Sequence, residues 1–498
     1  MRITNNMIMG NTKTNINSNK VNVDKYNTQM TTQKKISKAS ENPVIAIRSL
    51  RLSTSMTHIN QYLDNNIADA TSWLDVTYTA LNNMKDLLTD IRTQCVNGST
   101  DTLTASDRQT ILKNLEALQD QVYTEGNADY AGRTVFTGYR TTESLTFDED
   151  EASTTYSIEQ NFTFEDLETH RYYYGEAEVP SATDVAADVA NETECTIDVG
   201  RVTNYRLRLA YDSIESIDNG TISIGGTDTT NISTYESEAE WMASADFPLA
   251  EDSDQVIFLK STGELILPDN MAEAIVENKQ NISLSYTKTG FDAGDLCPEY
   301  YFNCTKNPGA ANEITYTLEE QEINYTIANN TQLTVNTQAR NVFSYDIDRD
   351  VTEMIDAVNY AIEAASKVDN IKEMMEQEQY ADEDSQAVLQ SYLDVAQKEA
   401  DLADDNLQKL YESYIGNFDE YLTKVNTAIT NVGSMQARLS LTQNRVENQQ
   451  TTVEELKSSN EDRDMSDIII DYYAAYNAYT ASLTAASKVG EQSLLKFL

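Results

Sequence analysis

The chain has 498 residues, enough for about three domains, and its 17 glycines and 6 prolines are few, which favours long helices over loop-rich architecture. Its formal net charge of −45 argues against nucleic-acid binding, because phosphates require clustered lysine and arginine. It has no apolar run of about eighteen residues, so no membrane span is expected, and its start lacks the apolar core of a Sec signal peptide.

The charge is unevenly distributed along the chain. Residues 141–350 contain 41 acidic and 10 basic side chains, whereas residues 1–50 contain 8 basic and 2 acidic ones. A strongly acidic middle is typical of a solvated exterior whose like charges keep neighbouring molecules apart. We therefore expect the middle of the chain to face solvent.

The first forty residues predict an amphipathic helix with a weak apolar strip. Asn42-Pro43 then interrupts the chain and starts the next helix, because proline is well tolerated at the first helical position. The apolar strip consists of Ile3, Met7, Val21, Val23, Met30 and Ile36.

A sustained heptad pattern follows Pro43 and ends at Asn97-Gly98. It lasts more than five heptads, which predicts a coiled-coil-like helix of roughly 54 residues and roughly 80 Å. One heptad position is occupied by Met56, Leu63, Ala70, Thr77, Met84 and Ile91, and the other by Ile67, Leu74, Leu81, Leu88 and Cys95.

A shorter helix and a turn complete the first half of the chain. Ser106 and Gln109 have the spacing of a capping box, and the apolar face that follows runs to Val122. The segment Tyr130–Tyr139 (YAGRTVFTGY) breaks the helical period and predicts a β-hairpin or extended turn.

The sequence pattern changes from helical periodicity to short alternating runs between residues 141 and 340. Short alternating runs such as Tyr205–Tyr211 and Val256–Leu259 are separated by turn signals such as Asn219-Gly220, which predicts a β-rich insertion. Asn219–Thr221 also matches a glycosylation sequon, but such triplets are expected by chance in a segment so rich in Asn and Thr.

Helical periodicity returns near Asp348, and a further helix follows the acidic break at residues 382–384. A calcium-loop interpretation of Asp346–Asp350 fails because Val351 and Ala357 stand where an EF-hand needs Gly and Glu. The last long stripe has alternating steps of four and three between Phe418 and Val453. A polar elbow follows it.

The final helix is expected to begin at an Asp464 N-cap and to have a tyrosine-rich apolar stripe. A single N-terminal helix is too narrow a partner for this stripe, so we expect it to pack against other subunits. The stripe contains Ile469, Tyr472, Tyr476, Tyr479, Leu483 and Ala486, and the chain closes on Leu494, Leu495, Phe497 and Leu498.

The order of elements predicts a mainly α protein with a β insertion. The N- and C-terminal halves are expected to form a long antiparallel helical bundle or coiled coil, with the β-rich domain inserted at its tip. The expected domains are an axial polymerisation domain (1–43 and 456–498), a long-helix bundle with its hairpin (44–140 and 341–455), and a solvent-facing acidic insertion (141–340).

No catalytic, metal or cofactor site is expected. The two histidines, His58 and His170, are too far apart for a zinc-peptidase helix, and no nucleophile and base can be named together. Cysteines 95, 195, 297 and 304 are expected to be free thiols, and the alternative is a disulfide between Cys297 and Cys304 in an oxidising exterior.

Several motifs at both ends resemble the flagellin superfamily and, within it, the hook–filament junction (hook-associated protein 3) family. Lys35–Val44 (KISKASENPV) is similar to the segment that joins that family's first two helices, with Glu41-Asn42 in place of Asp-Asp and Thr32-Gln33 in place of Ser-Gly. Asn127–Arg140 (NADYAGRTVFTGYR) is similar to the junction family's turn. Tyr62–Asn66, Arg438-Leu439, Glu461–Asp464 and the final Leu-Leu-x-Phe-Leu also fit.

The resemblance covers residues 1–140 and 340–498 and implies a structural part of the bacterial flagellum, exported without a Sec signal. Its implied partners are a hook-associated protein on the hook side, flagellin on the filament side, and further copies in a ring. The alternative is a filament flagellin, although Ala70–Leu81 and Leu87–Thr93 lack flagellin's usual runs. A coiled-coil surface adhesin is the third interpretation.

Overall fold

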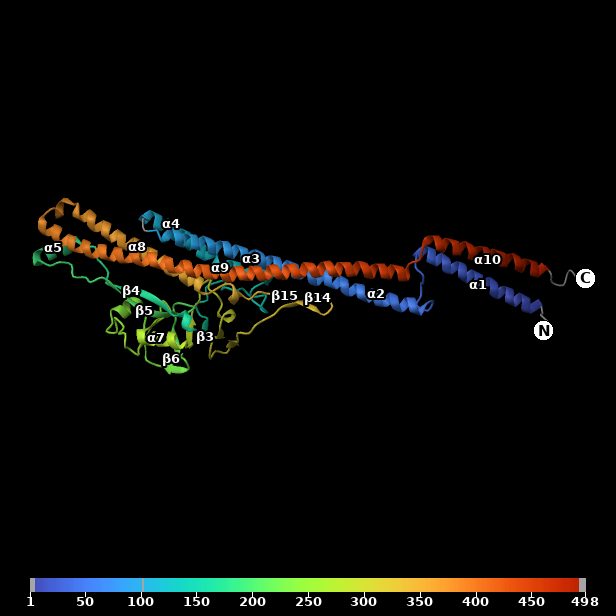
Figure 1. Cartoon of the computed structure of the whole chain (residues 1–498), viewed down its shortest axis with the longest axis horizontal. Coiled ribbons are helices and arrows are strands. Elements are labelled where there is room, and N and C mark those ends of the chain that lie inside the picture. Colours follow the sequence, from blue (N-terminus) through green and yellow to red (C-terminus); the bar gives the residue numbers. More distant parts are fainter. Residues whose placement is uncertain (1–4, 101–102, 492–498) are drawn as a thin grey trace, which may run out of the picture. The chain divides into compact units, whose positions relative to one another are not determined.

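The computed structural model describes residues 5–100 and 103–491. The chain divides into two compact units. Unit 1 comprises Met1–Thr71, Asn324–Leu333 and Gln436–Leu498, and unit 2 comprises Ser72–Ile323 and Thr334–Met435. Figure 1 traces the elements of both.

Unit 1 is built from helices of both chain ends. It holds α1 (Asn5–Thr32), α2 (Pro43–Gln61), the π-helix η1 (Tyr62–Ile67), the end of α9 (Glu383–Glu461) and α10 (Met465–Glu491). The predicted pairing of the two termini is confirmed, since α1 packs along α10 (Figure 1). A hairpin of β14 (Asn324–Ala328) and β15 (Thr331–Thr334) contacts η1, where Asn66 Nδ2 donates to the Thr326 carbonyl at 2.7 Å.

Unit 2 contains the other long helices, and their predicted stripes are buried. They are α3 (Ala68–Gly98), α4 (Ala105–Val122), α8 (Asp346–Met375) and the first part of α9. The heptad pattern is confirmed, and the turn at η1 is the one departure from α geometry within it. Fully buried members of these stripes include Leu74, Leu81, Met84, Leu88 and Ile91 in α3 and Phe418, Val425 and Val432 in α9.

The predicted start of α4 is wrong by two residues. The N-cap is Thr104, whose hydroxyl accepts from the Asp107 amide while the Asp107 carboxylate accepts from the Thr104 amide. Ser106 lies inside the helix. Both candidates have the spacing of a capping box, and Thr104 with Asp107 places a carboxylate in the first turn, where the helix dipole favours it.

The insertion is β-rich, as predicted, and its two sheets are mostly antiparallel. Among the described residues, one sheet has the strand order β4-β5-β10-β9-β8 and the other β13-β12-β3-β11-β6-β7. The strands are β3 (Thr155–Phe162), β4 (Glu168–Tyr174), β5 (Gly200–Arg208), β6 (Ser216–Ile224), β7 (Thr227–Thr229), β8 (Ile232–Tyr235), β9 (Val256–Leu259), β10 (Glu264–Leu267), β11 (Ile282–Thr289), β12 (Asn303–Lys306) and β13 (Ile314–Tyr316).

Short elements complete unit 2. The predicted hairpin consists of β1 (Asp129–Tyr130) and β2 (Arg133–Thr134). The insertion also contains three helices that its β-like texture concealed, α5 (Ala182–Asn191), α6 (Glu238–Met242) and α7 (Asp269–Asn278). Turns of 3₁₀-helix lie at Thr124–Asn127, Phe164–Asp166, Pro298–Tyr300, Ala339–Asn341 and Glu378–Tyr380.

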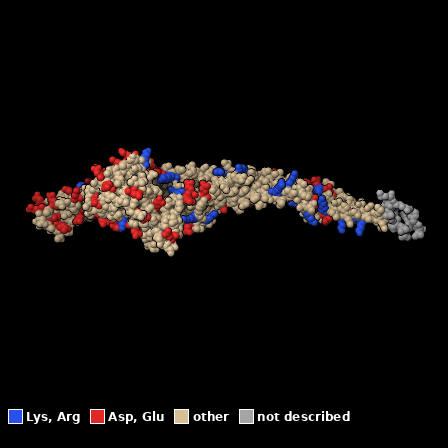
Figure 2. All heavy atoms as spheres, turned by 90° about the horizontal axis from the view of Figure 1, so that it is seen from below, with Lys and Arg blue, Asp and Glu red and all other residues tan. Residues whose placement is uncertain are grey.

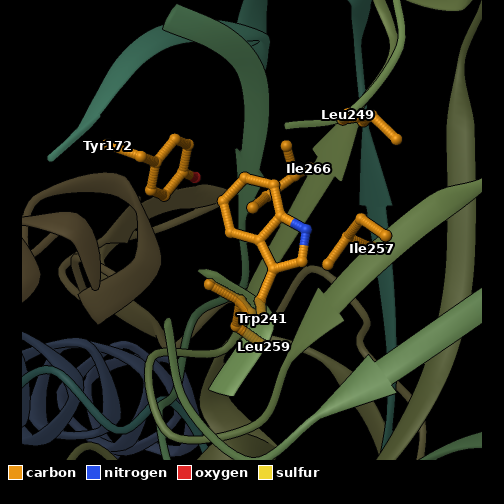
Figure 3. Packing of buried hydrophobic residues seen from close by; sticks show 6 residues of the cluster. All are labelled: Tyr172, Trp241, Leu249, Ile257, Leu259 and Ile266. Carbon is orange, nitrogen blue, oxygen red and sulfur yellow. The ribbon is translucent and has the colours of Figure 1, made fainter. Parts of the chain in front are cut away.

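The five-stranded sheet packs around Trp241 of α6, which is fully buried (Figure 3). The Tyr172 ring meets the indole edge-on with centroids 5.2 Å apart, and Ile257 and Ile266 lie beside the indole away from Tyr172. The insertion therefore has an apolar cluster of its own.

α5 leaves the sheets and lies against the end of the α8–α9 hairpin (Figure 1). Val185 packs on Tyr380, Val388 and Leu389, and the Ala177 amide donates to the buried Glu399 carboxylate at 2.7 Å. The insertion therefore reaches the far turn of the hairpin through α5, while Arg208 of its β5 strand contacts α8 from the side.

Candidate assembly surface

The pair formed by α1 and α10 buries very little of itself. Among the described residues of these two helices only Gln29 and Ile468 are buried. Asn19 Nδ2 donates to the Ala478 carbonyl at 3.3 Å, so polar contacts help to hold the pair. Two helices alone cannot enclose an apolar core, and their remaining apolar side chains stay in water in a single copy of the chain.

The predicted tyrosine stripe of α10 is divided between two faces. Tyr472 and Tyr479 are half-buried, whereas Ile469, Tyr476 and Leu483 are 39%, 48% and 43% exposed. One part of the stripe is thus partly covered within the chain, and the other part has no cover from it. Contiguous exposed apolar side chains of this kind mark interaction surfaces.

The other predicted interface residues follow the same division. Met7 is exposed, and Met30 and Ile36 are half-buried. Val21 of the predicted N-terminal strip is also exposed. Residues that the prediction omitted enlarge the exposed apolar set, namely Ile8, Met9, Met465, Ile470 and Tyr473. Ile3, Leu494, Leu495, Phe497 and Leu498 lie outside the described residues.

An ion-paired elbow joins α9 to α10. Lys34 Nζ lies 3.1 Å from Glu461 Oε2 and 2.6 Å from Asp462 Oδ1. The hydrogen bond to Asp462 raises the pKa of Lys34, and the reciprocal bond lowers the pKa of Asp462. A backbone hydrogen bond joins the same two segments, since the Lys35 amide donates to the Glu461 carbonyl at 2.7 Å. The elbow thus fixes where α10 starts.

Further contacts extend this elbow into α10 and α2. Asp464 acts as predicted at the start of α10, because its Oδ1 accepts from the Ser466 amide at 2.7 Å. The Arg463 guanidinium pairs with Asp471, and Ser49 of α2 donates to Glu461. The elbow is therefore held by directional contacts as well as by apolar packing.

Unit 2 contains a buried ionic cluster that was not predicted from the sequence. Arg206 of β5 pairs with Glu264 at 2.9 Å and with Glu353 of α8 at 2.7 Å, while Arg208 pairs with Asp350. Burial raises the pKa of Glu353, but the two arginines and His170 outweigh it and hold that pKa below its usual range. The cluster fastens the five-stranded sheet to α8. The sequence feature that could have indicated this cluster is the Arg-Leu-Arg alternation of β5, which places both arginines on one face of the strand.

The remaining candidate groups have structural surroundings. His170 lies 3.3 Å from Glu353 in that cluster, and His58 is exposed. All four cysteines are free, and burial raises the pKa of Cys304 to about 12. Within residues 5–100 and 103–491, no group of three or more His, Cys, Asp or Glu could hold a metal. In the same ranges no helix is long and apolar enough to cross a membrane.

Two family models match the helical ends of the chain. The model of the bacterial flagellin N-terminal helical region matches residues 3–141, and that of the C-terminal helical region matches residues 415–498. A curated relative, flagellar hook-associated protein 3 of Escherichia coli (strain K12), is 28% identical over 127 residues. That match spans 25% of this chain and 39% of the relative.

Solved structures show likeness over more of the chain. Flagellar hook-associated protein-3 of Legionella pneumophila has 10% identity and a TM-score of 0.30, covering 82% of this chain and 97% of its own. FlgL of Xanthomonas campestris has 11% identity and a TM-score of 0.28, covering 82% and 99%.

Proposed function

From the premise that this chain is a flagellin-superfamily protein of the hook-associated protein 3 type, we propose that it is a structural adaptor of the bacterial flagellum. It joins hook-associated subunits to the filament through its terminal helices and performs no catalysis. Its partners are a hook-associated protein on the hook side, flagellin on the filament side, and further copies in a ring. It acts outside the cell.

One observation carries this proposal. The α1–α10 pair leaves Ile469, Tyr476 and Leu483 exposed, although these side chains are large and apolar. Burying each of them contributes roughly 1.5–3 kcal/mol, which a neighbouring subunit would supply on assembly. The 28% identity to flagellar hook-associated protein 3 supports the adaptor role.

A first experiment removes Leu494–Leu498 from the purified full-length chain. Fluorescence of the two buried tryptophans, Trp73 of α3 and Trp241 of the insertion, reports whether unit 2 stays folded. We expect a native spectrum together with loss of binding to isolated hook ends. Undiminished binding of the truncated chain to hook ends would contradict the proposal.

A second experiment targets the described part of the surface. Tyr476→Asp places a charge on the exposed part of the stripe, whereas Ala481→Asp places the same charge at an exposed position outside it. We expect the first variant to lose binding to hook ends and the second to keep it. Equal binding by both variants would remove the stripe from the proposed interface.

The second candidate is a filament flagellin, which the two flagellin family models favour. Seeding purified protein onto hook ends separates the two roles. A flagellin elongates into long homopolymers, whereas an adaptor adds a limited cap that then accepts flagellin. Electron microscopy of the seeded ends measures the difference.

A further inference from the structure

A groove runs between α2 and the last part of α9, within unit 1. The two helices are antiparallel, and Asn460 Nδ2 donates to the Ile45 carbonyl at 3.1 Å while Gln450 Nε2 donates to Asn60 at 2.9 Å. Two open hollows of about 560 and 780 Å³ lie along this pair.

The lining of these hollows is basic, and it contains no carboxylate. Four cationic side chains line them, Lys35, Arg48, Arg51 and Arg445. This is unusual in a chain with 81 acidic residues. Within the described part of the chain none of the three arginines forms an ion pair. Their charges are thus available to a partner.

Apolar side chains accompany these cations. Leu441 and Leu456 line the hollows and are 74% and 53% exposed. On α2, Ile47 and Leu50 are 54% and 70% exposed beside the arginines. A surface that combines exposed leucines with unpaired arginines matches a helix that has apolar residues flanked by carboxylates.

We infer that this groove seats a carboxylate-rich helical face of a second copy of this chain. Unit 1 has 15 Lys and Arg against 13 Asp and Glu, whereas unit 2 has 21 against 68. Figure 2 shows acidic side chains gathered over the end of unit 2 that contains α5 and the α8–α9 turn. Copies of unit 2 repel one another, so an attractive contact between copies joins the groove of one to the acidic unit of the next. The inference rests on the proposed function, because it names one partner in that assembly.

Charge reversal in the full-length chain tests the groove. Arg48→Glu with Arg51→Glu places two carboxylates in it, and Lys85→Glu with Lys113→Glu makes the same change in charge on α3 and α4 of unit 2. Sedimentation velocity measures the self-association constant, and circular dichroism verifies the helix content. We expect the self-association constant of the groove variant to fall on the order of tenfold or more, and that of the control variant to change little. Rising salt should weaken the wild-type association.

Zero-length crosslinking identifies the occupant. Arg48→Lys keeps the charge and supplies an amine that a carbodiimide couples to a carboxylate in direct contact. A mixture of ¹⁴N- and ¹⁵N-labelled copies distinguishes links between copies from links within one. We expect mixed-isotope peptides joining residue 48 to carboxylates of residues 72–323 or 334–435. Links only within one copy, links only to added flagellin, or absence of wild-type self-association would overturn the second-copy assignment.

The two proposals fail in different ways. If the wild-type chain does not bind hook ends, the adaptor function is wrong whatever the groove does. If it binds hook ends and the Arg48→Glu, Arg51→Glu variant binds equally well and self-associates equally well, the adaptor stands and the groove inference is wrong.

Discussion

Gln33 stands at a backbone position that suits glycine. Its φ is +55°, in the left-handed region, and its amide bonds to the Gln29 carbonyl at the end of α1. The resembling family usually has Ser-Gly where this chain has Thr32-Gln33, and the left-handed backbone supplies a physical reason for that glycine.

A glycine at this position should therefore relieve strain. We expect Gln33→Gly to raise the free energy of unfolding of the full chain by up to about 1 kcal/mol, because the left-handed penalty exceeds the added entropy of the unfolded chain. Thr31→Gly, inside α1, should lower the free energy of unfolding by roughly 0.3 kcal/mol, because Gly is a slightly poorer helix former than Thr. Urea unfolding followed by circular dichroism measures both, and a destabilised Gln33→Gly variant would contradict the explanation.

The buried pair of Arg208 and Asp350 offers a second test at this scale. Arg208→Met leaves the Asp350 charge buried and uncompensated, which should cost about 3–5 kcal/mol. The matched control is Arg201→Met, which breaks a half-exposed pair with Asp405 and should cost about 1 kcal/mol or less. Chemical unfolding of both variants compares them directly. Equal costs would show that burial does not set the strength of this cluster.

At the scale of elements, helical periodicity was reliable wherever a stripe was long. The heptads ending at Cys95 and the stripe through Phe418 are buried as predicted, because one face of a long helix must meet another. Short elements were harder. α5 is only ten residues long, and its place depends on Val185 meeting Tyr380 and Leu389 from far along the chain.

Two glycines inside α9 provide a test of its helical stability. At Gly416 and Gly433 an added Cβ would meet nothing within 4 Å. We expect alanine at each position to raise the free energy of unfolding by roughly 0.5–1 kcal/mol. At Gly98 of α3 an added Cβ would lie 2.4 Å from the Tyr411 ring, so Gly98→Ala should lower stability. Thermal unfolding ranks the three variants. A higher stability of Gly98→Ala would contradict the close contact between Gly98 and the Tyr411 ring.

At the scale of the molecule, the main feature is the uneven distribution of charge between the two units. The net charge of −45 is concentrated in unit 2, where three carboxyl groups lie in sites that disfavour their ionised form. Burial raises the pKa of Glu238 to about 7 and that of Asp295 and Asp346 to about 6. Each ionised carboxylate therefore costs stability at neutral pH.

This charge balance predicts a stability maximum below neutral pH. A raised folded-state pKa means that the folded chain binds protons more readily, so stability increases as pH falls from about 7.5 to about 5. Glu353 acts oppositely, because its lowered pKa gives a contribution that is lost as pH falls below about 4.3. Melting temperatures at three pH values measure this. The rise in melting temperature on lowering the pH should be smaller in the double variant Glu238→Gln, Asp346→Asn. A melting temperature of the wild-type chain that is highest at pH 7.5 would contradict the prediction.

The sequence by itself determined the long helices, the β-rich character of the insertion and the helical nature of both ends, because each depends on local periodicity and composition. The bounds of the three predicted domains stay a prediction. Only the tertiary structure decided which face of α10 is covered by α1, which carboxylates meet Arg206 and Arg208, and that the α2–α9 groove has cations without carboxylates. Those features depend on residues that lie from 38 to more than 400 positions apart, and no local pattern specifies their contacts.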